Sequence, residues 1–250
     1  MGSIIIQEET TKNPITLIGK EAGICWGADT EDNYKNYKRG KECIQNDHGR
    51  TLEFPQVYIV IDSYSARVMR ELYTHIGGAP TRLQASTRYI NYKDFSEKEQ
   101  FVIPNSVIRE GGDALSIYVD TMDNIANAMS KLEDLGIPRE DIALMLPLGM
   151  HSKMVLRTNL RNLIDMSHQR LCTRANWEFR ELFKDIMKSL GEYSEEWKTI
   201  ISNCFKPKCE FLGYCPEKYT CKAHENTRLK ESIKYLKKSG YSIIEPDDMK

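Results

Sequence analysis

The stretch Gln84–Tyr92 combines residue types that could bind an anion or a nucleobase. It holds the hydroxyl of Ser86, the guanidinium of Arg88 and the rings of Tyr89 and Tyr92 within nine residues. If this stretch is extended, Ser86 and Arg88 point to the same side, because side chains alternate along a strand. A hydroxyl beside a planar fork of donors suits a phosphate or a pyrimidine carbonyl. A solvated edge strand with a single surface ion pair is the simpler alternative.

A second set of polar residues falls on an expected helix. Asn159, Arg161 and Arg170 are separated by apolar residues at helical spacing. Asn159 and Arg170 differ by eleven positions, about three turns, so we expect both side chains on one face. Arg161 falls in the first turn, where the N-terminal amides of a helix favour anions. A helix whose arginines make only salt bridges is the alternative.

Strands and helices are expected to position these residues. Residues 54–61 and 153–157 are apolar runs typical of strands, and Ser86–Tyr92 fits a short strand or an extended loop. Ser63 or Ser65 can cap a helix that runs to about His75. Further helices are predicted at 33–47, 114–135 with Gly136 as its stop, Thr158 or Asn159 to about Arg170, 175–189, 194–203 and 223–238.

These elements are segregated along the chain rather than strictly alternating, which favours an α+β fold over a doubly wound sheet. The sequence has no Gly-x-Gly-x-x-Gly or P-loop pattern, so a Rossmann or Walker nucleotide site is not expected. It also lacks repeats and Pro/Ser linkers. We therefore expect one domain at residues 1–200 and a cysteine-containing C-terminal appendix at 201–250 that packs on the same domain.

Composition excludes several classes of protein. The 250 residues carry a formal charge of −1 and are 40% hydrophobic, so no global field steers the chain to nucleic acid or to an anionic membrane. No apolar run approaches the roughly 20 residues that span a bilayer. The N-terminus does not resemble a signal peptide. We expect a cytoplasmic protein that binds neither nucleic acid nor membrane.

Four of the seven cysteines lie in the C-terminal part of the chain, at Cys204, Cys209, Cys215 and Cys221. Four soft ligands complete a tetrahedron, but these spacings differ from the paired C-x2–4-C pattern of zinc knuckles. Free or paired thiols that close a small loop fit equally well. We expect no metal, and the candidate ligands if one binds are Cys209, Cys215, Cys221 and His224.

Three blocks of the sequence resemble the flavin-dependent thymidylate synthase family. They are Gln84–Tyr92, Asn159–Arg170 and Ala175–Arg180. The resemblance covers most of residues 20–190 in order, and further matching segments are Ala22–Trp26, His48–Glu53, Ser65–Arg67 and Glu140–Pro147.

The resemblance implies an α+β fold with a central, largely antiparallel sheet and long helices. It implies methylation of dUMP to dTMP with FAD as cofactor and with methylenetetrahydrofolate and NADPH as co-substrates. It also implies a homotetramer whose sites lie between subunits.

The family's site residues carry over onto matching positions of this chain. Arg170 and Ser86 are then catalytic, with Arg170 stabilising the deprotonated uracil ring, a large electrostatic effect in a dry site. The nucleotide contacts implied are Gln84, Ser86, Arg88 and Arg170. The flavin contacts implied are Asn159, Arg161, His75 and His48.

The chain departs from the family at its Arg-His-Arg signature, where the sequence reads His75–Gly78. Ala85 and Ala143 replace a glutamate and an arginine of two other family motifs. A neighbouring subunit could supply the missing cations, as could Arg82, Arg50 or Arg139. Two alternatives remain open: a divergent paralogue that acts on another pyrimidine nucleotide, and a non-catalytic nucleotide-binding protein on the same fold.

Overall fold

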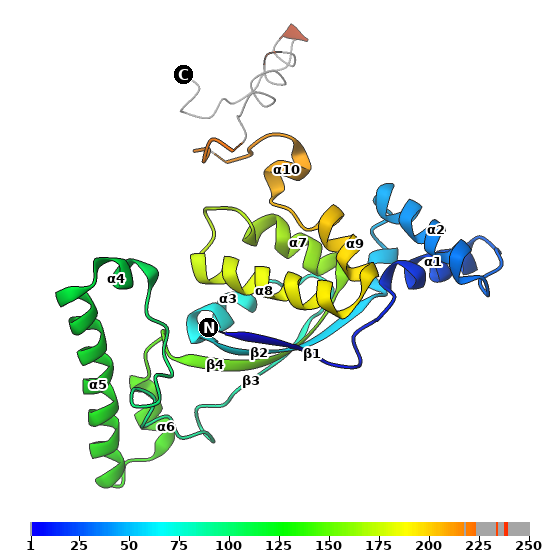
Figure 1. The fold of residues 1–250 in the computed structure, drawn as a ribbon. Helices are drawn as coiled ribbons and strands as arrows, with labels where there is room; N and C mark the ends of the chain where they lie inside the picture. Colours follow the sequence, from blue (N-terminus) through cyan, green and yellow to red (C-terminus); the bar gives the residue numbers. More distant parts are fainter. Residues whose placement is uncertain (1, 218, 224–233, 235–237, 240–250) are drawn as a thin grey trace.

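The computed structural model describes residues 2–217, 219–223, 234 and 238–239. One antiparallel sheet forms its centre, with its strands in the order β1-β2-β4-β3 (Figure 1). The predicted strands at 54–61 and 153–157 are confirmed, although the first begins two residues later and both run further than predicted. An N-terminal strand and a short edge strand flank them. The strands are β1 Ser3–Ile6, β2 Gln56–Ser65, β3 Thr81–Gln84 and β4 His151–Asn159.

One face of the sheet supplies the main core. Alternate residues of β2 and β4 are fully buried there, because the side chains of a strand alternate between the two faces. Helices α3, α7, α8 and α9 cover this face (Figure 1). Their bounds are Ala66–Leu72, Leu160–Arg170, Trp177–Tyr193 and Glu195–Cys204.

Side-chain caps set where these helices begin. Ser65, one of the two predicted caps, accepts from Val68 N at the start of α3, which ends at Leu72 rather than at about His75. Asn159 accepts from Asn162 N at the start of α7, also as predicted. The Asn159 cap therefore places Arg161 in the first turn of α7. Arg170 is the last residue of the same helix.

A helical hairpin lies at one end of the sheet. It consists of α1 (Pro14–Cys25) and α2 (Asn33–Gln45), which follows the predicted helix at 33–47. A Cβ added at Gly19 or Gly40 would overlap the backbone of the other helix. The two helices thus cross at van der Waals contact of their backbones, which only glycine permits.

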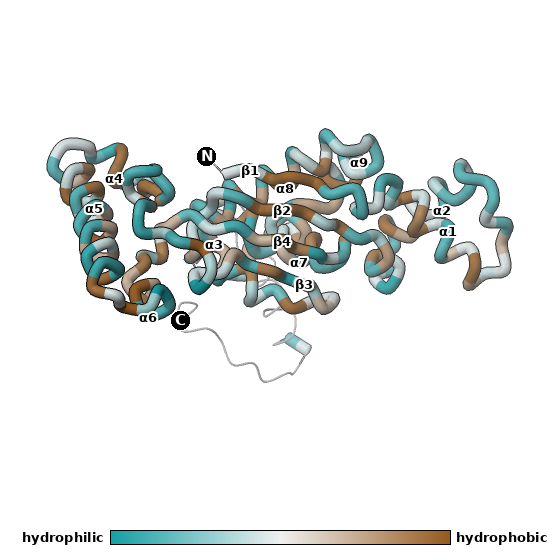
Figure 2. The backbone as a smooth tube through the Cα atoms, turned by 90° about the horizontal axis from the view of Figure 1, so that it is seen from below, coloured by the Kyte–Doolittle hydropathy of each residue, from teal (hydrophilic) through white to brown (hydrophobic). Residues whose placement is uncertain are grey.

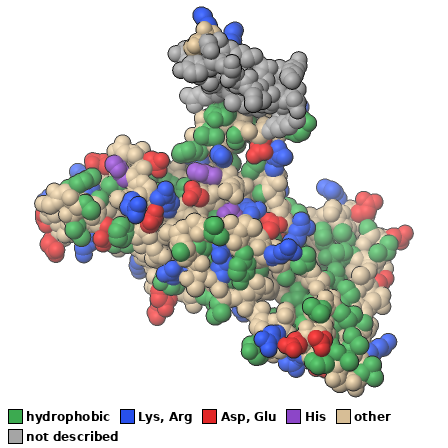
Figure 3. Space-filling view, turned by 180° about the vertical axis from the view of Figure 1, so that it is seen from behind, with side chains coloured by type: hydrophobic (Ala, Val, Ile, Leu, Met, Phe, Trp, Pro, Cys, Tyr) green, Lys and Arg blue, Asp and Glu red, His purple; other side chains and the backbone are tan. Residues whose placement is uncertain are grey.

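A separate helical lobe lies at the opposite end (Figure 1). It contains α4 (Asn105–Glu110), α5 (Gly112–Asp134) and α6 (Arg139–Ile142), and α5 confirms the helix predicted at 114–135. A second core that includes Phe95, Phe101, Met122 and Met129 holds the lobe together. Figure 3 shows hydrophobic side chains gathered on its outer surface.

The second face of the sheet is open, and no described helix covers it (Figure 2). Cross-strand pairing places Ile5, Val60, Val155 and Leu83 in one row across all four strands. Ile5 is 54% exposed and Leu83 is 73% exposed. The row is an apolar stripe on an otherwise polar face.

The C-terminal segment begins with α10 (Lys208–Leu212), which ends at Gly213 in a left-handed conformation. The predicted helix at 223–238 lies almost entirely outside the described residues, as does His224. Among the described residues no helix combines the length and apolarity needed to cross a bilayer. The α+β prediction is confirmed, with strands in one sheet and helices on one face and at both ends.

Candidate functional site

The guanidinium of Arg170 makes three side-chain hydrogen-bond contacts and stacks on the ring of Phe179. Its Nε donates to His75 Nε2 at 2.9 Å, and its Nη1 donates to Glu71 Oε2 at 2.9 Å. Its Nη2 lies 3.3 Å from Thr74 Oγ1, and its carbon lies 4.3 Å from the centre of the Phe179 ring. The Arg170 side chain is 16% exposed. A planar cation is therefore fixed in a nearly closed position.

His75 is a neutral positioning group in this cluster. Burial, together with the charges of Arg170 and Arg82, lowers the pKa of its imidazole to about 4. Because Nε2 accepts from Arg170, the proton of the neutral ring is assigned to Nδ1. At neutral pH His75 therefore orients the guanidinium and carries no charge of its own.

Glu71 is the partner that sequence reasoning missed. Its carboxylate accepts from Arg170 and, at 3.1 Å, from Asn176 Nδ2, and Arg67 Nε lies 3.8 Å away. The one available signal was its position a helical turn before His75. Glu71 balances the charge of Arg170.

The glycine pair after His75 rests on the N-terminus of α7. Gly78 has φ +67°, and a Cβ there would overlap the side-chain amide of Asn159. A Cβ at Gly77 would lie 3.0 Å from Asn162 Oδ1. Asn159 itself is buried and serves as the cap of α7. Both ends of α7 therefore face the connection between α3 and β3, as the eleven-residue spacing predicts.

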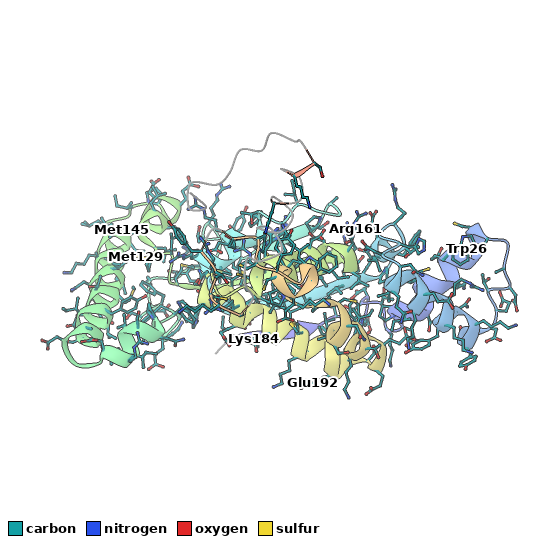
Figure 4. The ribbon with its side chains drawn as sticks, turned by 90° about the horizontal axis from the view of Figure 1, so that it is seen from above. Trp26, Met129, Met145, Arg161, Lys184 and Glu192 are labelled. Carbon is teal, nitrogen blue, oxygen red and sulfur yellow. The ribbon has the colours of Figure 1, made fainter. Side chains whose placement is uncertain are left out.

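Arg161 occupies a different surface, toward the α1–α2 hairpin (Figure 4). Its Nη1 donates to Glu53 Oε1 at 2.6 Å, and the side chain is half exposed. The neighbouring loop contains His48, which is exposed and whose carbonyl accepts from Thr51. Arg161 and the His48 loop thus lie together, away from the Arg170 cluster.

A cavity of about 800 Å³ opens beside Arg161. Four basic side chains line it, Lys41, Arg50, Arg161 and Lys206, against two acidic ones, Asp47 and Asp165. His168 also lines it, and its buried Nε2 has no hydrogen-bond partner among the described residues. Burial lowers the pKa of this imidazole. The cavity is within the usual size range of cofactor sites and favours an anionic ligand with polar atoms.

Gln84, Ser86 and Arg88 lie at the end of β3, next to the helical lobe. The expectation that Ser86–Tyr92 is extended is wrong: the carbonyl of Ser86 accepts from the amides of Tyr89 and Ile90, which closes a turn. Ser86 Oγ accepts from Arg88 N at 3.2 Å, a local bond that competes with a strand. The two side chains therefore do not form the alternating pair that the sequence predicted.

The end of β3 is nevertheless fixed in place. Gln84 Nε2 donates to Ser152 Oγ at 3.2 Å, and Arg88 Nε lies 3.2 Å from Glu140 Oε2 with both side chains exposed. None of the described side chains supplies an imidazole or carboxylate bonded to Ser86 Oγ. Ser86 is suited to donate or accept a hydrogen bond rather than to attack as an activated nucleophile.

The three candidate replacement cations lie in three different places. Arg82 donates to the carbonyl of His75 and stacks 5.3 Å from the centre of the Tyr73 ring, so it borders the Arg170 cluster. Arg139 donates to the carbonyl of Tyr89 near α6. Arg50 lines the basic cavity and has no ion-pair partner among the described residues. Arg50 is the one of the three that is available to a ligand there.

The fold is α+β, and its two basic sites have the charge and shape that suit anionic small molecules. The family described as thymidylate synthase complementing protein matches residues 8–193. The chain belongs to this family.

Similar proteins include the flavin-dependent thymidylate synthase of Pyrococcus abyssi. It is 32% identical over 172 residues, which are 68% of this chain and 69% of the relative. The enzyme of the same name from Pyrococcus furiosus is 26% identical over 215 residues, or 83% of this chain and 87% of the relative.

A solved structure shares the fold. It is the flavin-dependent thymidylate synthase of Helicobacter pylori complexed with FAD and dUMP, which superposes with a TM-score of 0.63 at 17% identity. The match covers 82% of this chain and all of that one.

Proposed function

We propose that the protein is an FAD-dependent thymidylate synthase, which methylates dUMP to dTMP with methylenetetrahydrofolate and NADPH as co-substrates. Family membership supports this reaction, and the relatives carry its name. The observation that carries the site is the placement of α7, whose Asn159 and Arg170 both border the His75–Gly78 turn.

The basic cavity fits part of a flavin dinucleotide in charge and size. FAD brings two phosphates, and Arg50, Arg161 and Lys206 line a space of about 800 Å³. The unpartnered Nε2 of His168 offers a further polar contact. We propose that Arg161 and Arg50 hold the pyrophosphate, with His48 and Asn159 nearby. When bound, FAD would supply the hydride, which protein side chains cannot provide.

Arg170 would bind the pyrimidine. Its fork of donors matches a carbonyl flanked by a deprotonated ring nitrogen, and its charge would favour loss of that proton. Phe179 and His75 keep the fork in one plane, so no reorientation is needed when the substrate charge develops. We propose that Gln84, Ser86 and Arg88 contact the rest of the nucleotide.

The ion pair between Arg170 and Glu71 favours one competing function. A cation already neutralised by a carboxylate stabilises a developing anion less well. A nucleotide-binding protein without catalysis would tolerate this pairing. The synthase remains the proposal, because Asn176 also donates to the Glu71 carboxylate and shares its charge with Arg170.

We further propose that the protein assembles as a homotetramer. The apolar stripe of Ile5, Val60, Val155 and Leu83 leaves one sheet face without a partner in the single chain. The residues proposed for nucleotide and flavin lie at separate places on one subunit, so a complete site needs a neighbour.

Two further predictions are kept as proposals. All seven cysteines are in the described part of the chain and are free thiols, as a cytoplasmic location favours. The packing of α10 against α7 supports a C-terminal appendix at 201–250 on a domain at 1–200.

Visible absorbance of the purified protein tests the proposal. Added FAD should bind and give a flavin spectrum, which should shift when dUMP is titrated in. An Arg161→Ala variant should bind FAD more weakly, whereas Lys188→Ala on the exposed surface of α8 should not. If saturating FAD leaves the protein without bound flavin, the synthase proposal is wrong and the binding-only alternative stands.

A further inference from the structure

The segment that follows α9, residues 205–213, is fastened to the body of the fold at three points. Phe205 is buried in the main core. The carbonyl of Lys206 accepts from Ser167 Oγ of α7 at 3.4 Å. Further along, the ring of Phe211 in α10 stacks on His168 of α7, with ring centres 4.9 Å apart. Segment 205–213 therefore has a defined course along one side of α7.

Segment 205–213 supplies two side chains to the basic cavity. Lys206 contributes one of the four positive charges that line it, and Phe211 lines it from α10. The family model matches residues 8–193, so both side chains lie beyond the part of the chain that the model covers. This wall of the cavity is thus a feature of the chain that family membership does not explain.

Phe211 is suited to stack a planar ring. The imidazole of His168 supports it at an interplanar angle of 31°, yet Phe211 is still 55% exposed. Exposed aromatic side chains of this kind stack nucleobases, because every base presents a π face. A stacked base would also remove apolar surface from water.

The same part of the cavity offers polar and charged contacts. His168 Nε2 is buried and has no hydrogen-bond partner among the described residues. Burial lowers the pKa of this imidazole, so the ring is neutral at pH 7 and its nitrogen can bond to the edge of a base. Lys206 and Arg50 bring positive charge to the same space. A base joined to a diphosphate matches this set of contacts.

We propose that Phe211 and Lys206 bind the adenosine diphosphate end of FAD and select the dinucleotide over FMN. Phe211 would stack on the adenine ring, and Lys206 would contact the diphosphate. FMN lacks the adenosine and the second phosphate, so it would gain nothing from this wall. The assignment rests on the proposed function, which supplies FAD as the cofactor. NADPH carries a similar adenine group and is the alternative source that the experiment separates.

Binding of FAD, FMN and ADP to the full-length protein tests the assignment without any turnover. Calorimetry gives the dissociation constant of each ligand. Phe211→Ala should weaken the binding of FAD and ADP roughly 5-fold to 100-fold, the range typical of one lost stacked base, and should leave the weaker binding of FMN unchanged.

Further variants separate stacking and charge from misfolding. Phe211→Tyr should restore the binding of FAD and ADP, because it returns an aromatic ring to α10. Lys206→Ala should weaken the same two ligands and make their affinity less dependent on salt. Tyr34→Ala is the control, since it removes a 66% exposed aromatic ring of α2 that does not line the cavity.

Three outcomes separate this assignment from the synthase proposal. If FAD binds but Phe211→Ala lowers the affinities for FAD and FMN equally, or lowers neither, the assignment is wrong and the synthase proposal stands. If NADP⁺ binds in a Phe211-dependent way and FAD does not displace it, the wall serves the other dinucleotide and the assignment is also overturned. If ADP binding depends on Phe211 in a protein that takes up no FAD, the adenine subsite is supported and the synthase proposal fails.

Discussion

Arg170 carries the most specific chemistry of any single side chain in this protein. Its guanidinium is oriented by His75, Thr74 and Phe179 and balanced by Glu71. A cation held in this way needs no reorganisation when negative charge forms on a substrate. Removal of this guanidinium is therefore expected to lower the rate of the reaction more than the affinity for the nucleotide.

Replacing Arg170 with Ala should lower kcat roughly 100-fold to 1,000-fold, the loss typical of one fixed electrostatic donor. Steady-state kinetics with dUMP as the varied substrate would measure it. Lys184→Ala, which removes an exposed cation paired with Glu181 on α8, is the control and should leave kcat unchanged. A pure increase in KM would show that Arg170 only binds.

His75 should make stability depend on pH. Its folded-state pKa of about 4 lies below the ordinary value of 6.5, so the unfolded chain takes up a proton first as the pH falls. The stabilisation is therefore present above pH 6.5 and is lost between pH 6.5 and 4, to a total of about 3 kcal/mol. Urea unfolding at several pH values should show that the free energy of unfolding falls less with acid for His75→Gln than for the unaltered protein. If the free energies of unfolding of the two proteins fell equally with falling pH, His75 would not be the source of the acid loss of stability.

At the scale of elements, α7 and the turn it contacts form the unit that positions the site. Gly78 combines a positive φ with contact against Asn159. Gly78→Ala should destabilise the protein by about 1–3 kcal/mol, because backbone strain and overlap act together. Gly27→Ala is the matched control, since Gly27 has φ +65° but nothing within 4 Å of a Cβ. Thermal unfolding of the two variants compares them, and equal losses would mean that contact with Asn159 costs nothing.

The sequence predicted the elements whose signals are local. The caps Ser65 and Asn159 and the apolar spacing of α5 were sufficient to place three helices. The turn at Ser86 was missed, because the bond between Ser86 Oγ and Arg88 N competes with the extended form that alternation suggested. Long-range features left no local signal. Glu71 and Arg170, which form an ion pair, lie ninety-nine positions apart in the sequence, on two different helices.

At the scale of the whole molecule, the helices that the structure describes cover only one face of the sheet (Figure 2). Exposed apolar rows on a sheet are typical of surfaces that pack against another chain. The stripe runs across all four strands, and the helical lobe adds exposed apolar side chains such as Ile117 and Leu144. The single chain is therefore expected to be one part of a larger assembly.

Val155→Asp should break that assembly, because it would place an unpaired charge in the centre of the stripe that the neighbouring subunit would cover. Light scattering after size exclusion should show the molar mass falling from a multiple of 28.9 kDa toward the single chain. Lys188→Asp on the exposed side of α8 should leave the mass unchanged. Circular dichroism would verify that the variant remains folded. An unaltered mass would mean that the open face is not the interface.

Formation of dTMP is the most direct test of the synthase proposal. The protein would be incubated anaerobically with FAD, NADPH, methylenetetrahydrofolate and dUMP, and the nucleotides would be separated and identified by mass. We expect dTMP formation that depends on FAD and is nearly abolished by Arg170→Ala. Flavin binding with dUMP recovered unchanged would contradict it, and would leave a nucleotide-binding protein on the scaffold of a synthase.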